Sequence, residues 1–327
     1  MAQLPLTIAC GPYDRMSGIA DGRVQIEGIE PTYVSIKSGP EIFARMIKNK
    51  EFDVSEMSAS TYMSARTRGG FPFIAIPVFP SKSFRHSFIF INKKSGIQKP
   101  TDLMGRRVGM MGYGQTAAVW IRGMLQDDFG IDLRKIHWLE GGSDAPYVAG
   151  KNVKVPDGLN IEVISNNIAM SDLLADGKID AMFGARHPAS FGKNPDVVRL
   201  FPNYREVERN YFRRTGIFPI MHTIVIREEL YERNRWIAAS LYKAFVEAKQ
   251  LADREMRFSG AMRYALPWLA HDIDEIDDLF GGDPFCYGVD ANRSSLVALA
   301  RYLQDQGFID RPIDVDTIFA PVISDHT

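Results

Sequence analysis

The sequence predicts an α/β fold in which strands alternate with helices around mostly parallel sheets. Apolar runs short enough for strands occur at residues 4–10, 32–36, 52–57 and 73–78, and helical patterns separate most of them. A second strand–helix series starts near residue 100. Such alternation is typical of βα units, in which a helix connects each strand to the next parallel one.

The first series contains two predicted helices, and one predicted strand after it is not preceded by a helix. Pro40 opens a predicted helix over residues 41–49, whose apolar side chains recur on one face, and a second helix covers residues 58–68. The apolar run at residues 88–92 follows no helix. Parallel strands need a crossover connection, so we expect this run to leave the first sheet.

The second series begins with a strand at residues 107–111 that turns through glycines into a helix at residues 117–125. Further strands and helices alternate up to about residue 201. The chain then resumes a strand at residues 223–226 and continues into a long amphipathic helix at residues 235–251. The remainder is helical apart from a Gly/Pro-rich interruption at residues 281–284.

The length of the chain allows two domains, because 327 residues can build two hydrophobic cores. The order of the elements predicts a discontinuous domain 1, made of residues 1–92 and 218–327, and a domain 2 made of residues 93–217. The sequence does not fix the oligomeric state, and a homo-oligomer is one option.

Composition excludes several classes of partner. The net charge of −1 gives no electrostatic reason to expect nucleic acid or an anionic membrane, and no apolar run approaches the length of a membrane span. Cys10 and Cys286 show neither disulfide-framework nor zinc-site spacing. The segment before Cys10 lacks a basic start and a long apolar stretch, so we expect a cytoplasmic protein if Met1 is the native start.

The glycine turn at residues 112–117 is the most informative motif. A strand that ends in glycines and enters a helix presents free backbone N–H groups at the positive end of the helix dipole, which favours an anion. The turn is too short for a Walker loop and lacks its lysine, so a small carboxylate is a better ligand than a nucleotide. The candidate binding residues are Tyr113, Gly114, Gln115 and Thr116. The alternative is a tight turn followed by a helix cap.

Arginines and histidines concentrate in the loops that follow the predicted strands. In an open α/β sheet, ligands bind at the carboxyl ends of the strands. Guanidinium groups bind carboxylates through two parallel hydrogen bonds, and histidine exchanges protons near neutral pH. The candidates are Arg15, Arg85, Arg186, His86, His187 and His222, with Asp14, Ser60 and Thr61 beside them.

Each candidate also has a structural interpretation. Arg15 suits a surface cation, and Arg85 with His86 suits the polar start of a strand. His222 follows a mostly apolar run and suits a core histidine. Asp14, and the hydroxyl residues at the start of the helix over residues 58–68, suit helix caps.

Two levels of family resemblance follow from longer motifs. KPTDLMGRRVG (99–109) and MIKNKEFDVSEMS (46–58) resemble substrate-binding proteins of the type II periplasmic-binding fold, which implies a ligand cleft between two α/β domains joined by two crossovers. Four further segments together resemble the 4,5-dihydroxyphthalate decarboxylase family: FRHSFIFIN (84–92), YGQTAAVWIRGML (113–125), GARHP (184–188) and TGIFPIMH (215–222). That family converts 4,5-dihydroxyphthalate to protocatechuate and carbon dioxide.

The implied chemistry assigns roles to the candidates. Each ring hydroxyl is para to a carboxylate, so protonation of the ring carbon gives a stabilised intermediate that loses carbon dioxide, and no cofactor or metal is required. We expect a small aromatic dicarboxylate to be bound by Arg85 and Arg186, one from each domain. His187 or His222 is expected to be the general acid, with Asp14 as the next candidate, and His86 is expected to orient the substrate.

Two other functions stay open at this point. A non-catalytic solute-binding protein for an aromatic acid would use the same fold, although binding alone does not call for three histidines. An enzyme of thiamine-precursor synthesis on this fold is less well supported, because the sequence has no cysteine-rich or histidine-rich motif suited to it.

Overall fold

A computed structural model of the chain describes residues 3–144, 157–165 and 167–322. The chain divides into two compact units. Unit 1 consists of Met1–Lys82, Ile220–Leu296 and Ile313–Thr327, and unit 2 consists of Ser83–Pro219 and Val297–Pro312.

Unit 1 contains a five-stranded sheet in the order β2-β1-β3-β11-β4. The strands are β1 (Leu4–Cys10), β2 (Ile29–Ser35), β3 (Val54–Ser58), β4 (Phe73–Lys82) and β11 (Ile220–Arg227). β1 runs parallel to β2 and β3, and β11 is antiparallel to β3 and β4. The carboxyl ends of β1, β3 and β4 therefore lie at the same edge as the start of β11.

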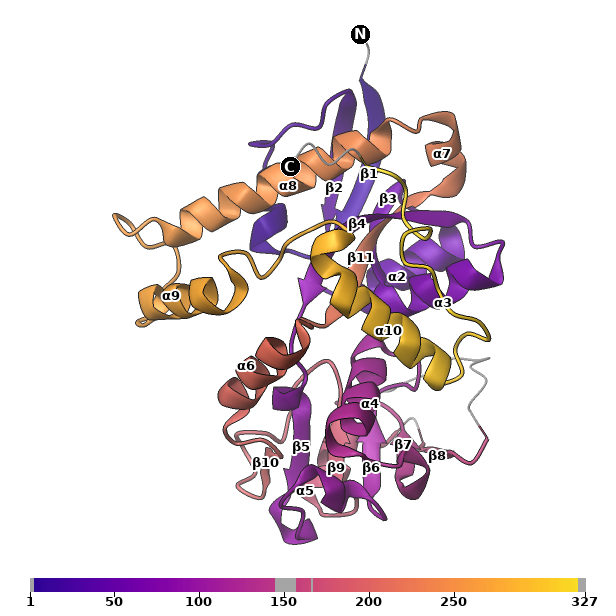
Figure 1. Cartoon of the computed structure of the whole chain (residues 1–327), viewed down its shortest axis with the longest axis vertical. Helices are drawn as coiled ribbons and strands as arrows, with labels where there is room; N and C mark the ends of the chain where they lie inside the picture. Colours follow the sequence, from indigo (N-terminus) through magenta and orange to yellow (C-terminus); the bar gives the residue numbers. More distant parts are fainter. Residues whose placement is uncertain (1–2, 145–156, 166, 323–327) are drawn as a thin grey trace. The chain divides into compact units, whose positions relative to one another are not determined.

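Helices cover this sheet because their apolar residues share one face. Leu241, Phe245 and Ala248 of α8 (Ile237–Arg257) are buried in one cluster with Ile8 and Ile26, and Figure 1 shows α8 running along the sheet beside β1 and β2. The other helices that begin in unit 1 are α1 (Ser17–Ala20), α2 (Gly39–Asn49), α3 (Ala59–Arg68), α7 (Glu228–Arg233), α9 (Leu269–Phe280) and α10 (Arg293–Asp305).

Unit 2 contains a six-stranded sheet in the order β10-β5-β9-β6-β7-β8. Its strands are β5 (Ile89–Asn92), β6 (Arg107–Met110), β7 (His137–Glu140), β8 (Asn160–Val163), β9 (Ala181–Phe183) and β10 (Val197–Arg199). β6 to β9 run parallel, whereas β5 is antiparallel to β9 and β10. The helices of this unit are α4 (Thr116–Phe129), α5 (Met170–Ala175) and α6 (Tyr204–Thr215).

The positions of the unit boundaries differ from the predicted domains. β5 leaves the first sheet, as expected, but the chain enters unit 2 already at Ser83 and not at residue 93, because β5 pairs with strands of the second sheet. Residues 297–312 also belong to unit 2, although they were expected in domain 1. Their side chains bind α4: Gln306 Nε2 donates to the carbonyl of Val119 at 3.0 Å.

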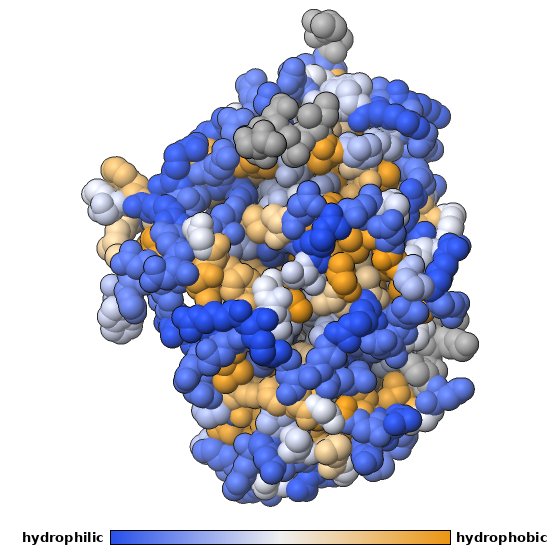
Figure 2. Space-filling model, in the orientation of Figure 1, coloured by the Kyte–Doolittle hydropathy of each residue, from blue (hydrophilic) through white to orange (hydrophobic). Residues whose placement is uncertain are grey.

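The surface is mostly polar on the face drawn in Figure 2, with hydrophobic residues scattered between the charged ones. The segment between α8 and α9 exposes several large apolar side chains, including Phe258, Met262 and Trp268. In the described ranges, no helix is both long enough and apolar enough to span a bilayer.

Candidate active site

A buried carboxylate lies at the strand edge of unit 1. Glu56, the central residue of β3, has a side chain with no exposed surface. Its Oε2 accepts hydrogen bonds from the backbone N–H of Gly11, at 2.9 Å, and from the thiol of Cys10, at 3.5 Å. Its Oε1 accepts from the hydroxyl of Tyr13, at 2.7 Å, and lies 2.5 Å from Nδ1 of His222.

These contacts decide the charge of Glu56. Burial acts to raise the pKa of the carboxyl, but the hydrogen bond and charge of His222, with the hydrogen bonds from Tyr13 and Gly11, outweigh burial and lower it. Burial, reinforced by the nearby carboxylate, raises the pKa of both Cys10 and Tyr13. Glu56 is therefore ionised at neutral pH, and the thiol and the phenol beside it are neutral.

His222 is the partly exposed member of this group, with 22% of its side chain accessible. It pairs with Ser58 of β3 and Ser81 of β4, and the β11–β4 register shifts on both sides of it, an irregularity of the kind found beside active sites. The ring of Phe43 contacts the imidazole edge-on at 5.0 Å. The hydrogen bond of this ring is made by Nδ1, and no hydrogen bond to Nε2 of His222 occurs within the described part of the chain.

The other predicted residues of unit 1 have structural partners. Arg15 Nε donates to the carbonyl of Pro80 at 2.8 Å and Nη1 to Asp14 at 3.0 Å, and the guanidinium packs against Tyr13 and Phe285. Asp14 also accepts from the backbone N–H of Arg15 at 2.7 Å.

The hydroxyl residues at the start of α3 include its cap. Ser58 is the N-cap of α3 and accepts from the N–H of Thr61 at 3.3 Å, as the capping interpretation predicted for this helix start. Ser60 is buried, with its Oγ 3.2 Å from that of Ser58. The predicted substrate contacts of Ser60 and Thr61 stay predictions.

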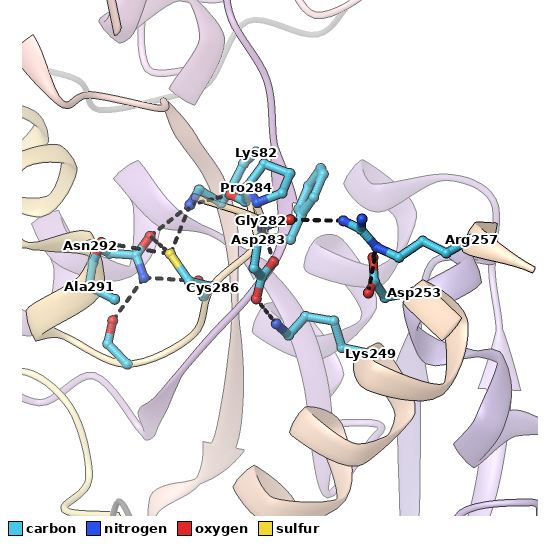
Figure 3. Close-up of polar contacts among 12 residues, drawn as sticks. Lys82, Lys249, Asp253, Arg257, Gly282, Asp283, Pro284, Cys286, Ala291 and Asn292 are labelled. Carbon is cyan, nitrogen blue, oxygen red and sulfur yellow. Dashed lines mark hydrogen bonds and ion pairs between the residues drawn. The ribbon is translucent and has the colours of Figure 1, made fainter. Parts of the chain in front are cut away.

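A buried lysine, missed in the sequence, lies at the end of β4. Figure 3 shows the Lys82 side chain converging with those of Asn292 and Cys286. Its Nζ donates to Asn292 Oδ1 at 2.8 Å and to the carbonyl of Pro284 at 2.9 Å, and lies 3.9 Å from Cys286 Sγ. Burial lowers the pKa of this lysine. The contacts tie the segment before α10 to the sheet of unit 1.

Unit 2 gathers its candidates at one edge of its sheet. Met110 at the end of β6 pairs with Phe183 at the end of β9, and Phe183 pairs with Ile89 at the start of β5. The loops after Met110, after Phe183 and before Ile89 therefore lie together. A Cβ atom on Gly184 would lie 3.8 Å from Oε1 of Gln115, which shows how closely two of these loops approach.

Arg85 is the most unusual residue of this edge. It is 5% exposed, and its Nε and Nη1 are buried without a hydrogen-bond partner among the described residues. Its guanidinium lies over the ring of Phe88 at 4.8 Å. Burial lowers its pKa to about 10, against a smaller opposing effect of Glu208. A buried cation with unused donors is suited to an anionic ligand.

The predicted histidines of unit 2 differ in environment. His86 is 1% exposed between the rings of Phe201 and Tyr211, and burial, with the charge of Arg214, lowers its pKa to about 4, so it is a neutral core residue. His187 is exposed, and partial burial and the charge of Arg199 lower its pKa.

The glycine turn has a similar mixture of roles. Tyr113 is buried, and its hydroxyl donates to the carbonyl of Gln306 at 2.8 Å, so its role is structural. Gln115 precedes α4 without capping it, and its Oε1 is buried with no partner within the described ranges. Thr116, the first residue of α4, is buried, and Gly114 is half-buried. Arg186 is exposed.

One sequence expectation needs correction, and one residue of the site was missed. Arg85 and Arg186 both belong to unit 2 and do not come from different domains, because the chain enters unit 2 at Ser83. Glu56 was missed, because it lies within an apolar run that was interpreted only as a strand. A carboxylate in such a run was itself a signal, since ionised groups are almost never fully buried without partners.

Within the described residues, no group of three or more His, Cys, Asp or Glu could hold a metal ion.

Comparison with known proteins identifies the fold. A family described as the periplasmic substrate-binding protein of a phosphonate ABC transporter matches residues 28–145. Two solved structures cover 98% of the chain: the periplasmic aliphatic sulphonate-binding protein SsuA of Escherichia coli (TM-score 0.54, 13% identity, 98% of that chain) and the desulfurization enzyme DSZB (TM-score 0.53, 14% identity, 97% of that chain). They establish the periplasmic-binding-protein-like fold.

Curated relatives are closer in sequence. The 4,5-dihydroxyphthalate decarboxylase of Pseudomonas putida is 35% identical over 215 residues, 65% of this chain and 83% of that protein. The 4,5-dihydroxyphthalate decarboxylase of Comamonas testosteroni is 34% identical over 323 residues, 98% of both chains. An alignment at this identity that spans both units leaves one conclusion: the chain belongs to the 4,5-dihydroxyphthalate decarboxylase family.

Proposed function

We propose that the protein is a carboxy-lyase that converts 4,5-dihydroxyphthalate to protocatechuate and carbon dioxide. The relationship to the Comamonas testosteroni enzyme over 98% of the chain supports this reaction. The observation that carries the mechanism is the partly exposed His222 paired with the buried carboxylate of Glu56 at the strand edge of unit 1. Such a pair suits general acid catalysis, because the carboxylate orients and stabilises a protonated imidazole.

His222 acts as the proton donor in this mechanism. Its Nε2 delivers a proton to the ring carbon that bears the leaving carboxylate, while the para hydroxyl supplies electron density and becomes carbonyl-like. The bond to the carboxylate then breaks, carbon dioxide leaves, and the electron pair of that bond restores the aromatic ring. The product retains the delivered proton on carbon, and solvent reprotonates His222.

Arg85 binds a substrate carboxylate in this proposal. Its buried Nε and Nη1 have no hydrogen-bond partner among the described residues, so the guanidinium has unused donors that a substrate carboxylate can accept from. The backbone N–H groups of the turn at residues 112–116 and the exposed Arg186 lie on loops of the same sheet edge. They serve as additional anion donors in unit 2.

The reaction is tested by incubating the purified protein with 4,5-dihydroxyphthalate and measuring carbon dioxide and protocatechuate. Equal molar release of both, abolished or strongly reduced in His222→Asn, is the expected result. Because the proposed chemistry uses the ring as its own electron sink, dialysis against a strong chelator should leave turnover unchanged. Activity that is lost on chelation and restored by one divalent ion would overturn the metal-free mechanism.

A non-catalytic binding protein for an aromatic acid is the second candidate. The match of residues 28–145 to a periplasmic substrate-binding family favours it, and the unpartnered Arg85 suits binding as well as catalysis. Calorimetry separates the two functions. Saturable binding of 4,5-dihydroxyphthalate with no carbon dioxide release would support the binding protein and contradict the enzyme.

The proposal also includes the expected cytoplasmic location and small-molecule partner. Cys10 and Cys286 are free thiols, a state that a reducing compartment preserves. Cell fractionation followed by detection of the protein tests the location, and recovery in the periplasmic fraction would contradict it.

A further inference from the structure

We propose that Glu56 is a positioning residue for catalysis, which holds His222 as the Nδ1–H tautomer and so makes Nε2 the atom that exchanges the proton. This inference rests on the proposed role of His222 as general acid. It adds two residues, Glu56 and its hydrogen-bond partner Tyr13, to those that determine the reaction.

The hydrogen-bond inventory of Glu56 fixes the tautomer. An ionised carboxylate only accepts hydrogen bonds, so each of its four contacts must come from a donor. Gly11 donates its backbone N–H, and Cys10 and Tyr13 donate their S–H and O–H. The fourth contact, 2.5 Å from Oε1, must therefore be an N–H at Nδ1 of His222. In neutral His222 the lone pair is then on Nε2, and in the protonated form Nε2 carries the transferable proton.

The environment also argues against a merely structural ion pair. A buried carboxylate is costly unless charge or hydrogen bonds compensate it. Three of the four donors to Glu56 are neutral, and no arginine or lysine forms an ion pair with it among the described residues. Among the described residues in contact with Glu56, His222 is the one whose side chain can carry a positive charge, because an imidazole with protons on both nitrogens is a cation.

Three strands hold the group in place. Glu56 is central in β3, Cys10 ends β1 and His222 lies near the start of β11, so the backbone hydrogen bonds of the sheet fix three of its members. Tyr13 follows β1, with its ring packed against the guanidinium of Arg15 at 4.5 Å. The polar residues that face the imidazole across the sheet are Ser58 and Ser81, which are uncharged. Glu56 is thus the charged group in direct contact with His222.

The direct test reads the tautomer by ¹⁵N NMR of histidine-labelled full-length protein, with His222 assigned from the spectrum of His222→Asn. In the neutral form we expect Nδ1 to resonate as a protonated nitrogen and Nε2 as an unprotonated one. In Glu56→Gln the preference for Nδ1–H should weaken, because an amide can present either its oxygen or its NH₂ group to Nδ1. An Nε2–H tautomer in the wild type would overturn the inference, whatever the activity.

Kinetics give the second readout. Glu56→Gln should lower kcat by about 10²–10⁴-fold, the range for loss of general acid function or of its orienting carboxylate, with KM changed by less than about tenfold. Glu56→Asp keeps the charge and should recover part of the loss. The matched control is Asp53→Asn, which removes a carboxylate bound to Thr7 and Arg227 and not to His222, and should keep kcat. Wild-type kcat in a folded Glu56→Gln variant would overturn the inference.

The design separates this inference from the proposed function. If His222→Asn keeps full turnover, the acid assignment fails, and the NMR result still reports what Glu56 does to the imidazole. If Glu56→Gln does not fold, Tyr13→Phe replaces it, since the loss of one donor leaves the charge in place. Tyr13→Phe should lower kcat less than His222→Asn does, and an unchanged kcat together with an unchanged His222 spectrum would remove Tyr13 from the group.

Discussion

The guanidinium of Arg85 lies over the ring of Phe88, 4.8 Å from its centroid, and neither its Nε nor its Nη1 has a hydrogen-bond partner among the described residues. A cation–π contact leaves the in-plane N–H groups unused. Arg85 thus packs against an aromatic ring while the N–H groups of Nε and Nη1 stay without a partner among the described residues.

Replacement of Arg85 should separate binding from stability. In Arg85→Met we expect the free energy of substrate binding to weaken by about 1.5–3 kcal/mol, the value of a hydrogen bond to a charged group. The melting temperature should stay the same or rise, because the change removes a buried charge without an ion-pair partner. Calorimetry and thermal unfolding measure the two effects. Arg107→Met, which removes an exposed arginine bonded to Asp180, is the control and should bind normally.

The two candidate acids should respond differently to mutation. His222→Asn should lower kcat by about 10²–10⁴-fold, because it removes the proposed proton donor. His187→Asn should lower kcat by less than about tenfold, because the lowered pKa of His187 leaves little of its protonated form at neutral pH. Steady-state kinetics of both variants decide the matter. A larger loss in His187→Asn would transfer the role of acid to unit 2.

His86 should make the folding stability of unit 2 decrease at acidic pH. Its pKa is about 4 in the folded protein and 6.5 for an unperturbed histidine, so between these values the unfolded chain binds the extra proton. Stability therefore falls as pH decreases from 6.5 towards 4, by about 3 kcal/mol in total. His86→Leu should lack this contribution and show a shallower dependence.

The measurement is urea unfolding at several pH values. Trp236 and Trp268 lie in unit 1 and can be replaced by phenylalanine, so that fluorescence reports Trp120 and Trp138 of unit 2. Parallel pH profiles for His86→Leu and its parent would contradict the assignment.

Gly123 should be intolerant of even a methyl group. It faces the ring of Tyr302 within unit 2, and a Cβ atom there would lie 2.4 Å from Cγ of that ring. Gly123→Ala should therefore destabilise the protein by about 1–3 kcal/mol, although alanine is favoured over glycine in an exposed helix by roughly 1 kcal/mol.

A double-mutant cycle tests the cause. Tyr302→Ala removes the obstructing ring, so Gly123→Ala in that background should cost less than in the wild type. Equal costs of Gly123→Ala in both backgrounds, measured by chemical unfolding, would show that Tyr302 is not the obstacle.

The features of the fold that the sequence predicted are those that depend on a local pattern of residues. The strand over Leu4–Cys10 has its predicted bounds, and the departure of β5 from the first sheet followed from the missing crossover helix. The sequence did not predict that Arg85 belongs to unit 2, because this assignment depends on which distant strands β5 pairs with. The sequence also identified His222, but not Glu56, since their contact joins residues 166 positions apart.

The burial of His86 and of His187 could not be predicted from the sequence either. His86 and His187 have similar sequence contexts, each beside an arginine and near a strand end. Their exposures are opposite because rings from distant segments, Phe201 and Tyr211, cover His86 alone. Tertiary packing of this kind leaves no local pattern in the sequence.

The reactivity of the Cys10 thiol reports local opening of the sheet in unit 1. It is fully buried with its proton held towards Glu56, and its raised pKa disfavours the thiolate that alkylating reagents attack. A reagent can modify it only in molecules whose sheet edge has transiently opened, whereas the partly exposed Cys286 reacts in the closed state. The rate of Cys10 alkylation, followed by mass spectrometry of the intact chain, therefore reports how often the strand edge that holds His222 opens.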